Sequence, residues 1–385
     1  MKPGHALAAA AAFFAAAPAL AQDAYRIGLS GALTGTSAGS HAPAIEGLRL
    51  YIDRLNTAGG SDGRTVEPIV LDDSGEASKG AANTRRLLSQ DRVSLLINAS
   101  LSSTFAPMMA DATRAGVPLL FASSACPREV YPPAENLLFC TTAFAARYDS
   151  EATLSLIADR PGTDIDIALV AMAIPLSRAE IDQAEVMAQG MGMRPVEKAV
   201  IPPPTADYTP FATRIQQLGA DWVYSWAPWV TQVRTLEALR RLGWEGQYAG
   251  WAHLEAEGEL ARLKDESFFA VGANSLFAEN LPVHQEIRAA AEAARSSYPP
   301  YQMSEGWIAG MVIEGALRGA AGTDAASILA SMKNLTVDTQ GLRGGPIVWT
   351  EGNHFRATQY YRIYRRDNAS QSVVVERDWF SYDVQ

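Results

Sequence analysis

Short apolar runs and stretches with helical periodicity alternate along most of the chain. Residues 26–29 read as a strand, and the apolar side chains from Ile45 to Leu55 recur at the spacing of one helix face. Further strands are expected at 66–71, 93–97, 117–121, 165–170, 196–201, 222–225 and 268–271, with another ending at Gly250. The expected helices span 78–88, 103–115, 177–189, 210–218, 230–242, 283–295 and 302–318. Strands that alternate with helices predict an α/β fold with mostly parallel sheets covered on both faces.

The alternation falls into two units. It stops near Thr141-Thr142 and restarts at Ile165, so each half reads as a separate α/β unit. Two late helical segments and a strand-rich stretch over 341–385 belong to neither unit by order alone. Both units therefore have material late in the chain with which to complete their sheets.

Composition and charge narrow the class of protein. The 385 residues are enough for two domains. Apolar residues make up 48% and charged residues 19%, which is typical of a globular protein. The net charge of −10 comes with no basic cluster, which argues against nucleic acid or an anionic membrane surface as partner.

Residues 1–21 have the organisation of a secretory signal peptide. Lys2 precedes an unbroken apolar run over 6–20, and Ala19-Leu20-Ala21 has the small-x-small pattern of a cleavage site. The run is too short and too rich in alanine for a membrane span. We therefore expect an exported, periplasmic protein that is cleaved after Ala21.

Cys126 and Cys140 are the two cysteines of the chain. In an oxidising compartment they are expected to form a disulfide, which would stabilise the fold by about 3 kcal/mol in the chain-entropy model. Two free buried thiols are the alternative.

Catalytic and metal-binding motifs are weak. Residues 35–39 match the G-x-S-x-G pattern of hydrolases, but Ser37 lies in a glycine-rich loop rather than on a sharp strand-to-helix turn. His253, His284 and His354 follow Ser37, so chain order leaves a catalytic triad open. No H-E-x-x-H or C-x-x-C pattern occurs. We expect no metal site, no cofactor and no enzymatic activity.

Several segments in order resemble one family, the type I periplasmic solute-binding proteins, which include the leucine/isoleucine/valine-binding proteins of ATP-binding-cassette importers. The resemblance runs from Arg26 to Tyr364. It is carried by Ile27–Gly35, Asn56–Gly60, Leu71–Asp73, Ser102-Ser103, Ala115–Leu120, Asp207–Phe211 and Ala220–Tyr224.

The resemblance implies two doubly wound lobes, joined by three hinge crossovers, that close on a solute. Lobe one would comprise 24–143 and 274–356, and lobe two 144–273 and 357–385. The implied partners are a small-molecule carboxylate and the membrane permease of an importer, and the implied state is a monomer. A ligand-sensing subunit of a membrane receptor is an alternative within the same fold.

The resemblance also points to residues that hold the solute's carboxylate. Ser102 and Ser103 open a helix after a strand, where family members that bind amino acids use a serine. A plain helix cap is the alternative. Ser123, Ser124 and Ala125 match a second contacting segment, in which Ala125 replaces the usual threonine.

One departure bears on the solute's identity. Amino-acid-binding members place an acidic residue where this chain has Ala252, and that residue pairs with the solute's ammonium. A buried ammonium without a carboxylate costs several kcal/mol. Glu255 or Glu257 could replace it only if the loop shifted. The sequence therefore disfavours an α-amino acid.

Aromatic residues gather in the segments expected to form the cleft. Trp226 and Trp229 follow one strand, Trp251 follows another, and Trp307 falls where the family has a stacking tyrosine. Phe144 lies at the first crossover. Flat rings suit a flat apolar ligand. Ordinary core packing is the alternative for each tryptophan.

Three polar residues complete the candidate set. Arg147, just past the first crossover, could clamp a carboxylate, although a surface position is the alternative. His41, in the loop after Ser40, could hydrogen-bond the solute, and His253 lies beside the aromatic segment. Together these residues predict a periplasmic receptor for a small aromatic carboxylate, with a branched-chain or other amino acid as the alternative ligand.

Overall fold

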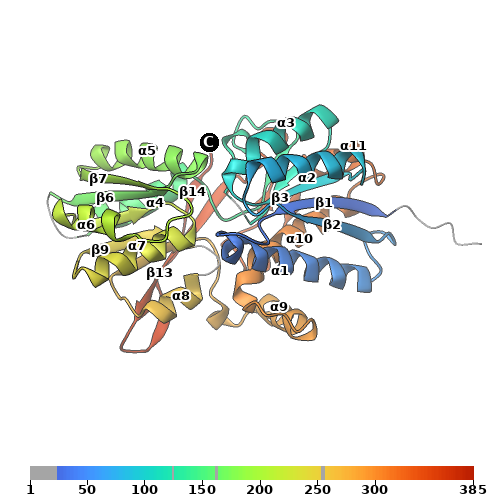
Figure 1. Ribbon diagram of the computed structural model, residues 1–385. Helices are drawn as coiled ribbons and strands as arrows, with labels where there is room; N and C mark the ends of the chain where they lie inside the picture. The colour runs from blue at the N-terminus through green and yellow to red at the C-terminus, as the bar shows by residue number, and fades with distance from the viewer. Residues whose placement is uncertain (1–23, 124, 161–163, 253–255) are drawn as a thin grey trace, which may run out of the picture.

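The computed structural model describes residues 24–385 except 124, 161–163 and 253–255. These residues form two α/β lobes that lie side by side, with late segments of the chain returning to each (Figure 1). The expected α/β class, two lobes and mostly parallel sheets are confirmed. Among the described residues, no helix is long and apolar enough to cross a bilayer, and no group of side chains could hold a metal ion.

Lobe one is built on a parallel five-stranded sheet in the order β2-β1-β3-β4-β5. Its strands are β1 Tyr25–Gly31, β2 Val66–Asp72, β3 Leu95–Ala99, β4 Leu119–Phe121 and β5 Leu138–Cys140. Its helices are α1 Ala38–Thr57, η1 Ser102–Thr104, α2 Ala77–Ser89, α3 Phe105–Ala115, η2 Arg128–Val130, η3 Phe277–Glu279, α9 Pro282–Ala293, η4 Pro300–Met303, α10 Ser304–Arg318 and α11 Ala325–Met332. A small hairpin of β11 Thr336–Val337 and β12 Ile347–Val348 completes the lobe.

Lobe two is built on a seven-stranded sheet in the order β14-β13-β10-β9-β8-β6-β7. Its parallel strands are β6 Asp166–Met172, β7 Arg194–Ile201, β8 Trp222–Ser225, β9 Gln247–Trp251 and β10 Phe268–Gly272. The long strands β13 Thr358–Asp367 and β14 Ser372–Asp383 are antiparallel. Its helices are α4 Arg147–Ala158, α5 Pro175–Gly190, α6 Thr209–Gln217, α7 Trp229–Arg241 and α8 Ala256–Leu263.

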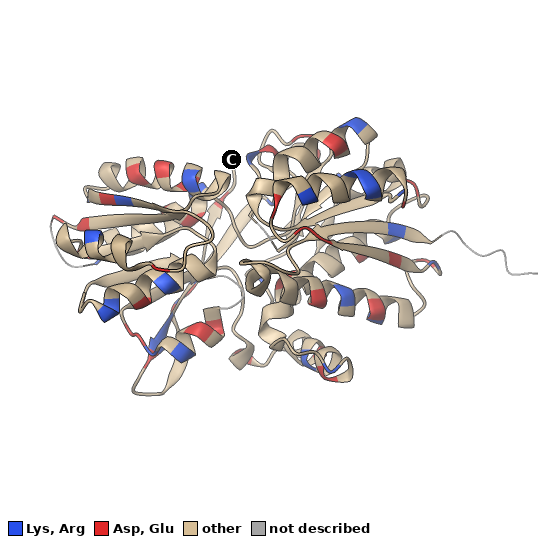
Figure 2. Ribbon diagram, viewed as in Figure 1, with Lys and Arg blue, Asp and Glu red and all other residues tan. Residues whose placement is uncertain are grey.

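Three segments carry the chain between the two sheets: one after β5, one after β10 and one after β12. The expected lobe boundaries at 143/144, 273/274 and 356/357 fall within these segments. Acidic and basic residues are interspersed along the ribbons of both lobes in the view shown (Figure 2).

The largest difference from the expected elements is at the start of α1. The helix begins at Ala38, well before the first apolar residues that mark its face, and Pro43 lies inside its first turns. His41 therefore lies on a helix rather than in a loop. The helices α4, α8 and α11 and the three-residue strand β5 were not expected from the pattern.

A cavity between the lobes as the candidate functional site

A cavity of about 460 Å³, counting its part open to solvent, lies between the two lobes. Lobe one contributes Ser40, His41, Ser100, Leu101, Ser102 and Ala125, and lobe two contributes Phe144, Ile174, Leu176, Ser177, Trp226, Ala227 and Pro228. Eight of these thirteen residues are apolar, and no charged side chain from the described part of the chain lines the cavity. The site therefore favours an apolar solute.

The fold explains why these segments meet. Residues 100–102 follow β3, Ala125 follows β4, Ile174 follows β6, and 226–228 follow β8. The carboxyl ends of parallel strands share one edge of a sheet, and loops at that edge form the usual ligand crevice of an open α/β sheet. Here two such edges face each other, one from each lobe.

Two of the four serines that line the cavity donate their hydroxyl hydrogen to groups of the protein itself. Ser100 Oγ donates to Asp73 Oδ1 at 2.5 Å, and Ser177 Oγ donates to the Trp226 carbonyl oxygen at 2.5 Å. Ser102 Oγ instead accepts from the Leu176 backbone N–H across the gap at 3.3 Å. Its own hydroxyl hydrogen therefore remains for an acceptor in the cavity. Ser102 lies where both lobes and a solute can meet.

The wall formed by Trp226 is fixed from behind by a buried carboxylate. Trp226 Nε1 donates to Asp149 Oδ2 at 2.9 Å, and the Tyr361 hydroxyl donates to Asp149 Oδ1 at 2.7 Å. Burial raises the pKa of Asp149 to about 7, although these two hydrogen bonds and the Ala145 N–H oppose the shift. Phe144 meets Trp226 edge to face at 5.8 Å between ring centroids. The two rings form one rigid aromatic corner.

Five of the residues expected at the site line this cavity: His41, Ser102, Ala125, Phe144 and Trp226. Ser123 is buried behind them, and its carbonyl oxygen accepts from His41 Nδ1 at 2.9 Å. Its φ of 68° is in the left-handed region, which a serine adopts at some cost. Ser123 thus orients His41 rather than lining the cavity itself.

Two polar candidates face elsewhere. Ser103 Oγ donates to the Gly75 carbonyl oxygen at 3.0 Å, within lobe one, and is not part of the cavity lining. Arg147 Nη2 donates to the Tyr148 hydroxyl at 2.7 Å and to the Gln385 carbonyl oxygen at 3.4 Å. Arg147 therefore contacts Tyr148 and Gln385 and is not part of the lining of this cavity.

Two of the four tryptophans expected in the cleft, Trp251 and Trp307, belong to packed cores and line no cavity between the lobes among the described residues. Trp307 is fully buried in lobe one, where its ring meets Tyr51 edge to face at 5.1 Å, so the expected stacking role is not met. Trp229 packs on Phe268 at 5.6 Å in lobe two, and it also lines a neighbouring cavity between the lobes that shares Ser40 with the first. Trp251 is buried 5.0 Å from Phe144, one layer behind the cavity wall. Large apolar rings are usually buried, and packing in the core decides where these rings lie although their segments were expected to form the cleft.

The remaining residues bear on the question of an acidic residue that could pair with the ammonium of an amino acid. Ser124 and His253 lie outside the described residues, as does Glu255. Ala252 packs in the lobe two core. The Glu257 carboxylate accepts from the Phe277 N–H at 2.8 Å and from the Ala278 N–H at 3.3 Å, and so caps a short helix away from the cavity.

Sequence reasoning missed Asp149 and the lobe two segment at 174–177. The signal for the segment was present, because a strand end followed by Pro175 marks a helix start at the cleft edge. Asp149 had no such signal, since an acidic residue in the first turn of a helix is normally an exposed partner of the helix dipole.

The hydrolase motif does not form a nucleophile elbow. β1 ends at Gly31 and α1 begins at Ala38, so Ser37 is the helix cap residue at the end of an intervening loop. Ser37 Oγ is buried and has no hydrogen-bond partner among the described residues. No described histidine therefore activates it.

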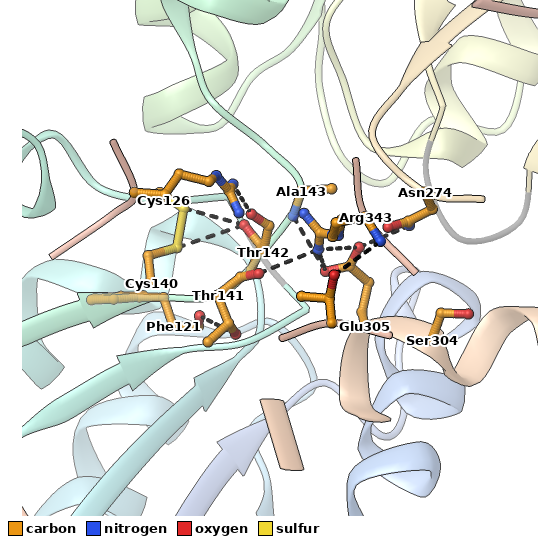
Figure 3. Close-up of polar contacts among 12 residues, drawn as sticks. Phe121, Cys126, Cys140, Thr141, Thr142, Ala143, Asn274, Ser304, Glu305 and Arg343 are labelled. Carbon is orange, nitrogen blue, oxygen red and sulfur yellow. Dashed lines mark hydrogen bonds and ion pairs between the residues drawn. A yellow bond between two sulfur atoms is a disulfide. The ribbon is translucent and has the colours of Figure 1, made fainter. Parts of the chain in front are cut away.

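The disulfide expected from the two cysteines is confirmed. Cys126 and Cys140 are bonded, with Cα atoms 5.8 Å apart. Both sulfur atoms lie near the Thr142 hydroxyl, at 3.2 and 3.6 Å (Figure 3). The bond thus ties the segment that leads away from Ala125 to the start of the first crossover.

A buried ion pair links the crossovers beside this disulfide. Glu305 and Arg343, each about 5% exposed at the side chain, are joined by Nη2–oxygen distances of 2.9 Å (Figure 3). Arg343 also donates to the Thr141 carbonyl oxygen at 3.2 Å. Glu305 accepts from the Ala143 N–H at 3.3 Å and from Asn274 Nδ2 at 2.9 Å. One carboxylate therefore holds the first two crossovers together.

Comparisons with solved structures agree with this architecture. A branched-chain amino acid transporter protein from Thermus thermophilus with bound valine superposes with a TM-score of 0.82 and 18% identity, over 94% of this chain and 97% of that chain. A solute-binding protein from Rhodopseudomonas palustris BisB5 in complex with 3,4-dihydroxybenzoic acid gives 0.79 and 17%, over 94% and 99%. A solute-binding protein from R. palustris in complex with benzoate gives 0.77 and 18%, over 92% and 96%.

At the level of sequence, no curated protein matched the chain. The model of one protein family, described as "Periplasmic binding protein", matches residues 24–371. That match spans both lobes, all three crossovers and every described residue that lines the cavity. The chain therefore belongs to the periplasmic binding protein family.

Proposed function

We propose that this protein is the periplasmic receptor of an ATP-binding-cassette importer and that it captures a small aromatic carboxylate in the cavity between its lobes. The observation that carries the proposal is the lining itself. It combines an aromatic corner, Phe144 and Trp226, with no charged side chain from the described residues. Two solved structures of the same fold are complexes with benzoate and with dihydroxybenzoate, which supports this ligand class.

The Ser102 hydroxyl would hold the carboxylate, because it keeps its hydrogen for the solute after accepting from the Leu176 N–H. A neutral His41 ring uses its one N–H on the Ser123 carbonyl oxygen, so it has no second N–H for the carboxylate. Hydrogen bonds to a charged acceptor are stronger than those between neutral groups, so a carboxylate can be held without an arginine. The aromatic corner would then cover the ring.

An α-amino acid fits this lining less well. Its ammonium would be buried beside Ala227 and Ile174 with no described carboxylate in the cavity wall. Leaving such a charge unpaired costs several kcal/mol. The Thermus thermophilus structure with valine makes an amino acid the second ligand class to test.

The deciding experiment is isothermal titration of the purified protein with benzoate, 4-hydroxybenzoate, cyclohexanecarboxylate, leucine and valine. Benzoate has about nine non-hydrogen atoms, so micromolar affinity needs about −0.9 kcal/mol per atom, well inside the range open to small ligands. We expect micromolar binding of the aromatic acids and none of leucine. Tight binding of leucine with no response to any aromatic carboxylate would reject the proposal.

Two neighbouring serines offer a matched pair of variants. Ser102→Ala removes a hydroxyl that lines the cavity, and we expect it to weaken benzoate binding about tenfold. Ser103→Ala removes a hydroxyl bonded to Gly75 within lobe one and should leave affinity unchanged within about twofold. Equal losses in both variants would mean that the serines act on the fold and not on the solute.

The cellular setting follows from the same proposal. We propose that residues 1–21 are removed after Ala21 on export, that the mature protein is a monomer, and that its closed form is read by a membrane permease. Intact-mass measurement of protein recovered from the periplasm would give a chain beginning at Gln22 if the cleavage is as proposed. A mass that retains residues 1–21 would contradict it.

A further inference from the structure

A smaller cavity lies at the hinge. Its volume is about 210 Å³, less than half of the 460 Å³ given by the same measure for the solute cavity. It is lined by Ala273, Arg343, Gly345, Pro346, Ile347, Arg356, Gln359 and Tyr360. These residues come from the second crossover, from the end of lobe one and from the third crossover into β13, and they include no acidic side chain.

Both arginines of this cavity are buried and have unused hydrogen-bonding capacity. Arg343 is 6% exposed and Arg356 is 4% exposed. In each guanidinium, Nε is shielded from solvent and has no acceptor among the described residues. Buried donors without partners are uncommon in native proteins, and a charged donor is the costliest kind to leave unpaired.

The two arginines differ in charge balance. Arg343 is paired with Glu305 (Figure 3). Arg356 Nη2 donates to the Thr142 carbonyl oxygen, but no described carboxylate lies within ion-pair distance of Arg356. Asp149 is near enough for its pKa to be lowered by the Arg356 charge, yet its oxygens are engaged by Trp226, Tyr361 and Ala145. The hinge therefore carries a buried cation without a contacting counter-ion.

We propose that the hinge cavity binds a small inorganic anion of halide size between Arg343 and Arg356. The charge of the site selects an anion, because two guanidinium groups line it and no acid does. Its volume, less than half that of the solute cavity, favours a small ion. The ion would join lobe one to the third crossover, at the point where the lobes rotate relative to one another.

The first test is crystallographic and uses the unmodified protein. Crystals grown or soaked in bromide should show an anomalous peak in the hinge cavity, within hydrogen-bond distance of the Nε atoms of Arg343 and Arg356. Density for water alone at both Nε atoms, with no anomalous signal, would overturn the proposal.

The second test measures the melting temperature in chloride and in gluconate at equal ionic strength. Chloride should raise the melting temperature of the unmodified protein by about 3 °C, because an ion that binds only the folded state stabilises it. Arg356→Gln should abolish the difference between the two salts. Arg85→Gln, which removes the same charge from an exposed position on α2, should retain it.

An equal melting temperature in both salts for the unmodified protein, or a chloride effect that persists in Arg356→Gln, would count against the site. Neither test uses the transported solute. Failure of the anion site and failure of the proposed aromatic ligand are therefore separate outcomes.

Discussion

Asp149 is a buried carboxylate whose hydrogen-bonding partners are all donors. The Trp226 indole, the Tyr361 hydroxyl and the Ala145 N–H point at its two oxygens. A neutral carboxylic acid would lose one acceptor position and gain an unpaired hydroxyl, so these hydrogen bonds oppose the effect of burial, but burial prevails and the pKa of Asp149 is raised. Asp149 acts as a positioning residue for the aromatic wall of the cavity.

Asp149→Asn should therefore reduce ligand affinity more than it reduces the stability of the structure around Asp149. An amide has one acceptor oxygen in place of two, so the Trp226 indole and the Tyr361 hydroxyl can no longer each donate to an oxygen of their own, and the aromatic wall is held less firmly. We expect about a tenfold loss of benzoate affinity by isothermal titration. Asp159→Asn, on the exposed end of the same helix, serves as the control and should leave affinity unchanged. An unchanged affinity in Asp149→Asn would show that Trp226 does not need this anchor.

Burial of two carboxyl groups predicts how stability depends on pH. Burial raises the pKa of Asp149 to about 7, and burial together with the Asp149 charge raises the pKa of Glu180 to about 8. The folded state thus keeps protons that the unfolded chain has released, so the stability that these two groups contribute is present below about pH 4 and is lost as the pH rises towards 8. The loss is at most about 4–5 kcal/mol per group.

Glu180→Gln removes one of the two titrating groups, and urea unfolding between pH 4 and 8 should show a shallower decline than in the unmodified protein. The Ser150 hydroxyl can still donate to the amide oxygen, so the packing is retained. Parallel curves for the two proteins would mean that the Glu180 carboxyl is not protonated in the folded state.

At the scale of single residues, only part of the candidate site could be predicted from the sequence. Ser102, Ala125 and Trp226 follow strand ends, and topology places strand ends at the cleft. Trp307 could not be placed in the same way, because a helix presents one face to its sheet and only packing decides which face. Its neighbour Tyr51 belongs to α1, a contact between distant segments that local spacing does not reveal.

Among the elements, the closest packing is between α1 and α10. A Cβ atom added at Gly306 would lie 1.7 Å from the Ala44 carbonyl oxygen, and one at Gly47 would lie 2.4 Å from the Met303 carbonyl oxygen. Both obstacles are backbone atoms, which cannot move aside as a side chain can. The short distance between the two helices therefore requires glycine at positions 47 and 306.

Gly306→Ala should cost more than about 2 kcal/mol of unfolding free energy, measured by urea denaturation, because the helices must separate to admit the methyl group. Gly190→Ala is a matched control at the end of α5, where an added Cβ meets nothing within 4 Å. It should be neutral or stabilise by up to about 1 kcal/mol. A Gly306→Ala variant as stable as this control would contradict the close packing.

Most of these elements could be predicted from periodicity, and the exceptions have physical reasons. The strand β5 has three residues, too few for a recognisable period. The helix α4 buries polar residues, including Asp149, Ser150 and Thr153, so its inner face does not read as apolar. The start of α1 is similarly built from Ser40 and His41, which are buried although they are polar.

For the whole molecule, the Glu305–Arg343 pair is the contact that most directly joins the moving parts. It lies on α10 and on the segment after β11, yet it bonds to the first and second crossovers. Fully buried ion pairs gain little over apolar packing, but removing one partner leaves an unpaired charge.

Glu305→Gln should therefore lower the unfolding free energy by about 3–5 kcal/mol, measured by chemical denaturation. Glu76→Gln, which breaks the exposed pair with Lys79, should cost less than about 1 kcal/mol and provides the control. If both changes cost the same, the hinge pair contributes no more than a surface contact.

The last two strands, β13 and β14, complete a sheet whose other members are made before the helices α9 to α11. During translation, the edge of β10 stays unpaired until β13 and β14 have been made, so the lobe two sheet is completed only after α9 to α11 of lobe one. This order also means that a premature stop codon after α11 would remove β13 and β14 from the sheet of lobe two, most of which is synthesised before α9. Such a truncation would damage the protein far more than the loss of a segment that belongs to no sheet.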